Sequence, residues 1–88
     1  MSLNSESLKQ IIQTRLPTTE VYVSDMSGGC GQAFSVIIIS TSFEGLNKLK
    51  RSRLINGLLK EEISAIHAFT QKNFTPEEWE VQKGNYNV

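Results

Sequence analysis

The chain contains one cysteine, Cys30, and one histidine, His67, and these side chains offer the most specific chemistry in the sequence. Thiolate and imidazole are good ligands for zinc and for iron–sulfur centres. A structural zinc ion takes four protein ligands, and an iron–sulfur cluster takes about four, with histidine able to replace cysteine on one iron. A site built from Cys30 and His67 is therefore incomplete. Its other ligands would have to come from a second chain or a small thiol.

The same two residues could also act as a nucleophile and its base. That chemistry needs a third, orienting group and a substrate pocket, and the sequence indicates neither. The chain also lacks a nucleophile elbow, a Walker motif and a dinucleotide-binding fingerprint. We therefore expect a protein that is not an enzyme. The plainer alternatives are that Cys30 is a small apolar residue and that His67 interacts with a helix end.

Length and charge limit the class of protein. With 88 residues the chain forms one domain, and nine basic against nine acidic residues give no net charge. Bulk attraction to nucleic acid or to a membrane surface is therefore absent, and no apolar run approaches the roughly 20 residues of a membrane span. A single cysteine forms no internal disulfide, which indicates a reducing compartment, the cytoplasm or the nucleus.

Hydrophobic periodicity and turn residues define the elements that must position Cys30 and His67. Pro17 ends the first helix, and three glycines in four positions make Ser27–Gln32 a loop. Thr75 and Glu78 form a capping box around Pro76, which begins the last helix. The expected elements are a helix Ser5–Arg15, strands Glu20–Asp25 and Ala33–Thr41, a long helix Asn47–Ala65, a strand His67–Phe74, and a helix that follows Thr75 and ends at Gly84.

The order α-β-β-α-β-α predicts one two-layer α+β domain over residues 1–88, ordered from about 5 to 83, with a loose tail over 84–88. The first two strands form a hairpin with the glycine loop at its tip. A right-handed helical crossover makes the second and third strands parallel, giving a three-stranded mixed sheet. Parallel strands start at the same edge, so Cys30 and His67 should lie at one end of the domain. Trp79 is expected to face the core.

The first half of the long helix is basic, with Lys48, Lys50, Arg51 and Arg53 in six positions. These side chains form either an ordinary solvated helix face or a surface for a partner.

The chain resembles the BolA family over nearly its whole length. The order and spacing of the following segments carry the resemblance: Ser24-Asp25, Gly29-Cys30-Gly31-Gln32-Ala33-Phe34, Phe43-Glu44-Gly45, Arg51-Ser52-Arg53-Leu54-Ile55-Asn56, Leu59-Lys60-Glu61-Glu62, Ile66-His67-Ala68-Phe69 and Thr75-Pro76-Glu77-Glu78-Trp79. The resemblance implies a class II KH-like fold. The His-Ala-Phe and Thr-Pro-Glu-Glu-Trp segments are most similar to the cytosolic and nuclear eukaryotic branch.

Members of that branch pair with monothiol glutaredoxins, and the resemblance implies the same heterodimer here. The complex holds a [2Fe-2S] cluster, to which glutaredoxin supplies a cysteine and glutathione a thiol. The BolA protein supplies its histidine, here His67, and in some members the loop cysteine, here Cys30. The positive helix segment would face the partner or the glutathione carboxylates. The implied roles are iron–sulfur cluster trafficking and iron-status regulation.

Three alternatives remain open. A KH-like domain could bind nucleic acid through the basic helix segment, although the region Phe43–Lys50, where we expect the GXXG loop of KH domains, contains no such motif. The chain could instead be an interaction module without metal, or it could form a homodimer bridged by the same ligands. A shared cluster should be lost as pH falls through the ordinary histidine range, about 6.5, because only neutral imidazole is a ligand.

Overall fold

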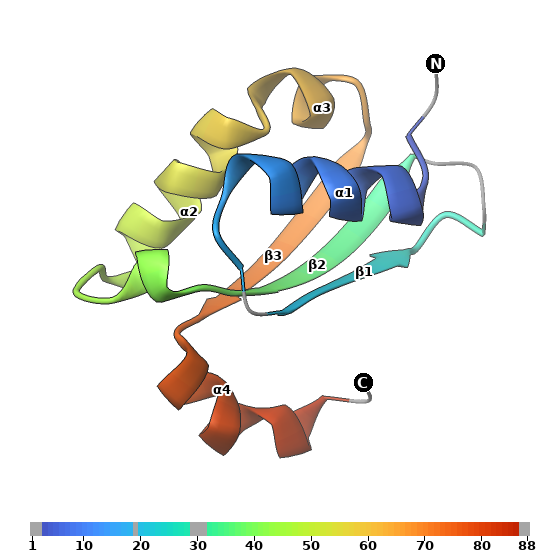
Figure 1. Ribbon diagram of the computed structural model, residues 1–88. Helices are drawn as coiled ribbons and strands as arrows, with labels where there is room; N and C mark the ends of the chain where they lie inside the picture. Colours follow the sequence, from blue (N-terminus) through green and yellow to red (C-terminus); the bar gives the residue numbers. More distant parts are fainter. Residues whose placement is uncertain (1–2, 19, 29–31, 87–88) are drawn as a thin grey trace.

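The computed structural model describes residues 3–18, 20–28 and 32–86 of the chain. Its elements follow the predicted order, with the long helix divided in two (Figure 1). They are α1 (Ser5–Arg15), β1 (Glu20–Asp25), β2 (Ala33–Ile39), a 3-10 turn (Thr41–Phe43), α2 (Lys48–Leu58), α3 (Lys60–Ser64), β3 (Ala68–Phe74), α4 (Pro76–Gln82) and a second 3-10 turn (Lys83–Asn85).

The sheet has the predicted mixed topology, with β2 in the centre. β1 runs antiparallel to β2 and pairs Asp25 with Phe34, and β3 runs parallel to β2 and pairs Ala33 with Ala68. β2 ends at Ile39, earlier than expected. The reason is that Ser40 accepts a hydrogen bond from the Ser42 amide and starts the 3-10 turn.

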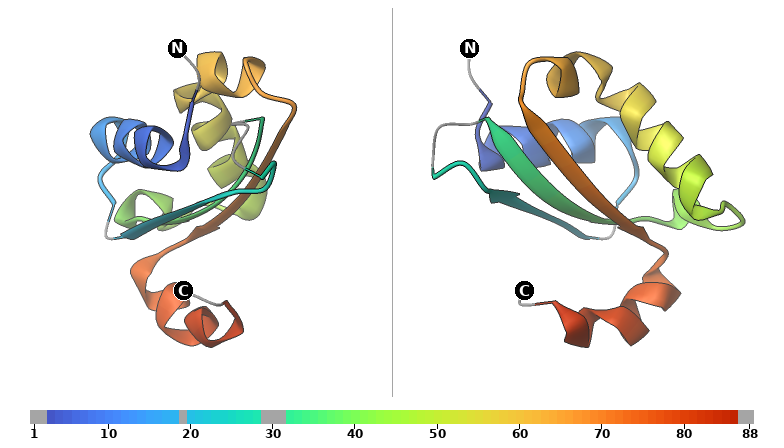
Figure 2. Two further views of the ribbon diagram at one scale, coloured as in Figure 1. Left: turned by 90° about the vertical axis from the view of Figure 1, so that its right-hand side faces the viewer. Right: turned by 180° about the vertical axis from the view of Figure 1, so that it is seen from behind.

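One face of the sheet is covered by α1, α2 and α3, and we call it the helical face (Figures 1 and 2). Its core joins Leu8 and Ile12 of α1 to Ile55 of α2 through Phe34 and Ile38 of β2, all buried to 2% exposure or less. The apolar sides of α1 and α2 thus face the sheet. This helix-on-sheet packing is the main hydrophobic layer.

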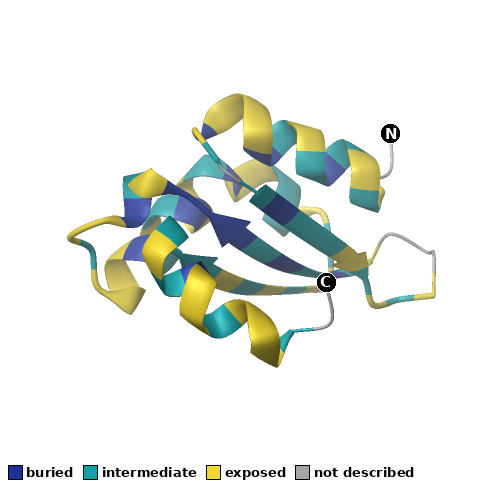
Figure 3. Ribbon diagram, turned by 60° about the horizontal axis from the view of Figure 1, so that its bottom comes forward, coloured by how far each residue is buried: buried dark blue, intermediate teal, exposed yellow. Residues whose placement is uncertain are grey.

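The opposite face of the sheet is partly covered by α4, which the left view of Figure 2 shows across the sheet from the other helices. Trp79 is buried, as predicted, but it belongs to an aromatic cluster on this second face, with its ring centroid 5.8 Å from Tyr22 and 5.6 Å from Phe74. The buried core therefore has a second part on this face of the sheet, and Trp79 belongs to it. Figure 3 shows that the outer side of α4 is exposed, while buried residues lie in the strands behind it.

The aromatic cluster also extends into the segment predicted to be a loose tail. Tyr86 packs its ring against Phe74 and Trp79, at centroid distances of 5.8 and 5.7 Å. The ordered fold therefore continues past residue 83, because an aromatic ring close to the chain end gains enough burial to hold the segment.

The predicted long helix is interrupted at Leu59, whose φ of −114° and ψ of 23° fall outside helical geometry. A contact from α1 fixes the interruption. Arg15 donates from Nη1 to the carbonyl of Leu58 at 2.7 Å, and its guanidinium also binds Glu62 of α3. The helix ends where a distant side chain satisfies its free carbonyl, and such a contact leaves no local pattern in the sequence.

Helix starts follow the sequence closely. Asn4 accepts from the Ser7 amide to cap α1, and Thr75 and Glu78 form the predicted capping box of α4. Within the described residues, no helix combines the length and apolarity required to cross a membrane.

Candidate functional site

His67 lies in the bend between α3 and β3, and its side chain is exposed. Its main-chain N–H donates to the carbonyl of Gln32 at 2.8 Å, and the N–H of Ala68 donates to the same oxygen at 3.2 Å. Strand β3 therefore begins at Ala68, one residue later than predicted. His67 is held at the start of the strand by its backbone, which leaves the imidazole without a hydrogen-bond partner among the described residues.

The hairpin end next to His67 is braced by a short series of hydrogen bonds. The Asp25 carboxylate accepts from the N–H of Ser27 at 2.8 Å and from its hydroxyl at 2.6 Å. The Ser27 hydroxyl oxygen in turn accepts from the N–H of Gln32 at 3.2 Å. Together with the Gln32–His67 bond, these contacts connect β1, the two described ends of the glycine loop and β3. Gly28 allows the chain to leave β1 because its φ is +74°.

Cys30 is one of residues 29–31, which lie outside the described residues. The sequence places it two positions before Gln32, the residue that binds the His67 backbone. Among the residues that the structure describes, no group of three or more histidine, cysteine, aspartate or glutamate side chains could hold a metal ion. Of the two predicted ligands, the described residues thus include one, the exposed imidazole of His67.

Met26, Ala33 and Ala68 form an uncharged surface next to His67, on the face of the sheet away from α1 and α2. Met26 is 68% exposed there, and its N–H donates to the carbonyl of Ala33 at 2.8 Å. Ala33 pairs with Ala68, the residue after His67. The sequence does not single out Met26. The only signal was an apolar residue directly beside a glycine loop, and such a residue is equally consistent with burial.

The basic residues of α2 divide into two groups. Lys48, Lys50 and Arg53 are exposed, as a partner-binding surface requires. Arg51 is only 9% exposed and points inward, which removes it from that surface. It had been grouped with the others because charge alone does not reveal which helix face a residue occupies.

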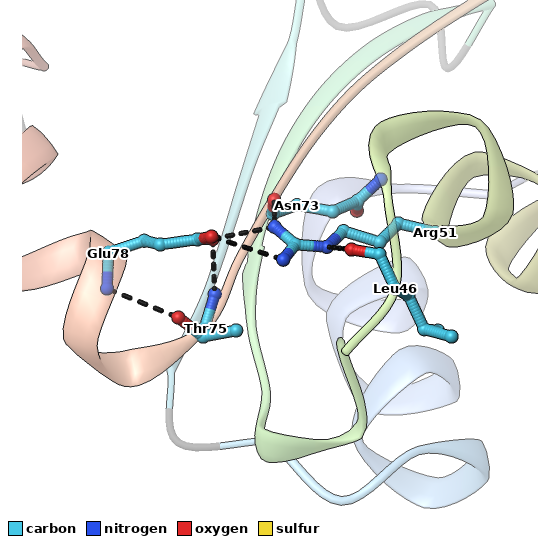
Figure 4. A network of polar contacts seen from close by, with 5 residues as sticks. All are labelled: Leu46, Arg51, Asn73, Thr75 and Glu78. Atoms are coloured by element: carbon cyan, nitrogen blue, oxygen red, sulfur yellow. Dashed lines mark hydrogen bonds and ion pairs between the residues drawn. The ribbon is translucent and has the colours of Figure 1, made fainter. Parts of the chain in front are cut away.

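Arg51 is held by carbonyl and carboxylate groups of the loop before α2, of β3 and of α4 (Figure 4). It donates to the carbonyls of Leu46 and Asn73 at 2.8 and 3.2 Å, and to the two carboxylate oxygens of Glu78 at 2.6 and 3.1 Å. The hydrogen bonds from Arg51 to the Glu78 carboxylate keep the pKa of Glu78 below its ordinary value. The hydrogen bond from the Thr75 N–H lowers this pKa further. Arg51 therefore has a structural role at the junction of α2, β3 and α4.

The structure separates His67 from the start of α2. Lys48 lines a groove with Asn73 and Phe74 at the far end of β3, whereas His67 precedes the strand. Seven residues of strand span about 23 Å at roughly 3.3 Å each. A tripeptide such as glutathione spans about 10 Å, so one held at His67 would not reach Lys48.

A second connection between successive helices lies at Leu59, between α2 and α3. It contains Gly57, Leu58, Leu59 and Lys60 and lacks the second glycine of a GXXG motif. The motif is therefore missing from this connection as well.

Comparison with known proteins places the chain in a family. It matches the family described as "BolA-like protein" over residues 7–78. It is 41% identical over 80 residues to BolA-like protein 2 of Saccharomyces cerevisiae, covering 90% of this chain and 67% of that protein. It is also 41% identical over 80 residues to BolA-like protein 2 of Homo sapiens, covering 90% and 93%.

Solved structures agree with this comparison. A Bol-like protein from Babesia bovis superimposes with a TM-score of 0.82 at 38% identity, over 94% of this chain and 96% of that one. Yeast Fra2, solved in solution, superimposes with a TM-score of 0.78 at 37% identity, over 100% and 98%. Sequence and fold together identify the chain as a member of the BolA family.

Proposed function

We propose that this BolA protein is the partner of a monothiol glutaredoxin and co-ligates a bridging [2Fe-2S] cluster through His67. The observation that carries the proposal is the arrangement at His67: an exposed imidazole whose backbone is fixed to Gln32, beside the loop that contains Cys30. Cys30 is the candidate second ligand. The protein would act in cluster trafficking and iron-status regulation in the cytoplasm and nucleus, as a binding partner and not as an enzyme.

The ligand count supports a shared site over a self-contained one. A cluster needs about four ligands, and the described residues offer one imidazole. With Cys30 the chain would supply two, so a partner cysteine and the thiol of glutathione would complete the set. A homodimer bridged by the same side chains would need no glutaredoxin, and it is the outcome to distinguish by experiment.

The uncharged surface around Met26 supports a protein partner at this end. Met26, Ala33 and Ala68 lie next to His67 without charged side chains, so a second protein can approach closely. Apolar, uncharged surface is typical of the centre of protein interfaces, and methionine is enriched there. We propose that glutaredoxin covers this surface when it ligates the cluster.

A second candidate function is weak nucleic-acid binding. It is favoured by Lys48, Lys50 and Arg53, which are exposed on one helix and have no ion pair among the described residues. Such contacts would give weak binding that depends strongly on salt concentration.

The decisive test is a visible absorption and circular dichroism titration of cluster-loaded monothiol glutaredoxin, with glutathione, against this protein. Wild type should change the cluster spectrum, and His67→Ala should not. The Cys30→Ala trace decides whether the thiol also ligates. If His67→Ala still binds glutaredoxin and gives the wild-type spectrum, the protein is an interaction module without metal ligation. If wild type neither binds nor changes the spectrum, salt-dependent binding to single-stranded nucleic acid is tested next.

A further inference from the structure

Strand β3 is an edge strand, since β2 lies on one side of it and no described strand lies on the other. In a parallel strand, the N–H and the carbonyl of one residue point toward the same neighbouring strand, and those of the next residue point to the opposite side. The Ala68 N–H and the Phe74 carbonyl bond toward β2, to Gln32 and to the Ser40 N–H respectively. The main-chain groups of the intervening odd-numbered residues, among them Gln71 and Asn73, therefore face the free edge.

Part of this edge lies in a groove. The groove has a volume of about 580 Å³ and follows β3 from Gln71 to Phe74, between the start of α2 and the end of α4. The carbonyl of Asn73, which faces the free edge, already accepts a hydrogen bond from Arg51. The Asn73 N–H and both main-chain groups of Gln71 have no hydrogen-bond partner outside the sheet among the described residues. The groove therefore contains unused main-chain donors and an acceptor in the geometry of a sheet.

The charge of the groove is positive. Its lining includes Lys48, Arg51 and Lys72 and one carboxylate, Glu78, so three positive charges less one negative charge give +2. Arg51 and Glu78 are paired with each other, whereas Lys48 and Lys72 have no carboxylate within ion-pair distance among the described residues. A second copy of this chain would bring the same positive charges to the edge and be repelled. An acidic segment would be attracted.

We propose that an extended, acidic segment of a partner protein adds to β3 as a fourth strand in this groove. Main-chain bonds to Gln71 and Asn73 would give affinity, as in other cases of β-strand addition. Lys48 approaches from the helical face, whereas Lys72 stands at an opposite-face position of β3, in register with Ile37. Successive side chains of a strand alternate between faces. The matching segment therefore carries two consecutive acidic residues, one for each lysine.

This site is independent of the proposed cluster function, because it lies at the other end of β3 from His67. It also has a defined limit. The Arg51–Asn73 bond closes the edge at its carboxyl end, so an added strand would stop there.

The test is an amide NMR titration of the labelled protein with the blocked peptide TVEEVT. The amides of Gln71 and Asn73 should shift and exchange more slowly with solvent, and the peptide TVKKVT should not bind. Two methylated peptides separate the two edges of the added strand. Methylation of the peptide nitrogens that face β3 should abolish binding, and methylation of the alternate nitrogens, which face away from β3, should leave binding intact. Lys72→Glu and Lys48→Glu should each weaken binding roughly five- to tenfold.

Two matched variants serve as controls. Lys60→Glu reverses an exposed charge outside the groove, and His67→Ala removes the proposed cluster ligand; both should bind TVEEVT like wild type. The proposal is overturned if no amide shifts at millimolar peptide, if the shifts map outside the groove, or if both methylated peptides bind equally. Equal weakening by Lys60→Glu and Lys72→Glu would overturn it as well, since it would show general charge attraction.

Discussion

Arg51 of α2 and Glu78 of α4 bind each other through two hydrogen bonds of 2.6 and 3.1 Å, although 27 positions separate them in the chain. The same carboxylate accepts from the Thr75 N–H and so closes the capping box of α4. The Glu78 side chain thus helps to start the last helix and ties that helix to α2, on the other side of the sheet.

Removing this carboxylate should destabilise the fold twice over. Glu78→Ala breaks the cap and leaves Arg51, only 9% exposed, without its counter-ion, so we expect the free energy of unfolding to fall by about 2–3 kcal/mol. Glu78→Gln keeps a hydrogen-bonding group and should cost about half as much. Urea denaturation of both variants checks this. Equal stability of Glu78→Ala and wild type would show that the pair contributes nothing.

The lowered pKa of Glu78 gives the stability a definite pH dependence. The unfolded chain binds a proton at Glu78 more tightly than the folded protein does. The stabilisation is therefore complete above the ordinary value of 4.5 and is lost as pH falls further, through the folded pKa. Because the Glu78 side chain is 43% exposed, the pH-dependent contribution of Glu78 to the free energy of unfolding should be below about 1 kcal/mol. Denaturation between pH 7 and pH 3 should show a smaller acid loss in Glu78→Gln than in the charge control Glu77→Gln.

Two glycines should respond in opposite directions to the same substitution. Gly57 lies inside α2 with open space around it, so Gly57→Ala should stabilise the protein by about 0.5–1 kcal/mol. Gly45 has a φ of +80°, and Gly45→Ala should destabilise it by about 1 kcal/mol. Thermal unfolding of the two variants provides the comparison. If Gly57→Ala also lowers the melting temperature, the break at Leu59 depends on Gly57 and not on Arg15 alone.

The exposed Met26 should matter for the partner and not for the fold. Met26→Lys places a charge on the uncharged surface beside His67, so we expect glutaredoxin binding to weaken about tenfold or more while the unfolding free energy stays within about 0.5 kcal/mol of wild type. Calorimetric titration measures the first quantity. Leu49→Lys, which changes another exposed apolar residue at the start of α2, is the matched control. Unchanged affinity in Met26→Lys would place the partner elsewhere.

Local patterns predicted the elements well. The helix start at Thr75, the bounds of α1 and β1, and the parallel pairing of β2 with β3 all follow from spacing, capping residues and crossover rules. The proximity of His67 to the end of the glycine loop also follows from topology, because parallel strands begin at one edge. The Gln32–His67 bond confirms that deduction for the described residues.

The misses share a physical cause, which is that each depends on a contact between distant residues. Arg15 of α1 binds the Leu58 carbonyl where the long helix breaks. Glu78 of α4 draws Arg51 inward, away from the basic surface. The periodicity of one segment carries no information about contacts with distant segments. The burial of a charged side chain or the end of a helix that depends on such a contact therefore cannot be predicted from that segment.

Because of the hydrogen bond between Gln32 and His67, the proposed ligand site forms only when the crossover between β2 and β3 has folded. The two residues are 35 positions apart, and every element of the crossover from β2 through α2 and α3 lies between them. A chain in which the crossover has not closed carries the same imidazole, but far from the glycine loop. Partial folding would therefore not place the proposed ligand beside the glycine loop.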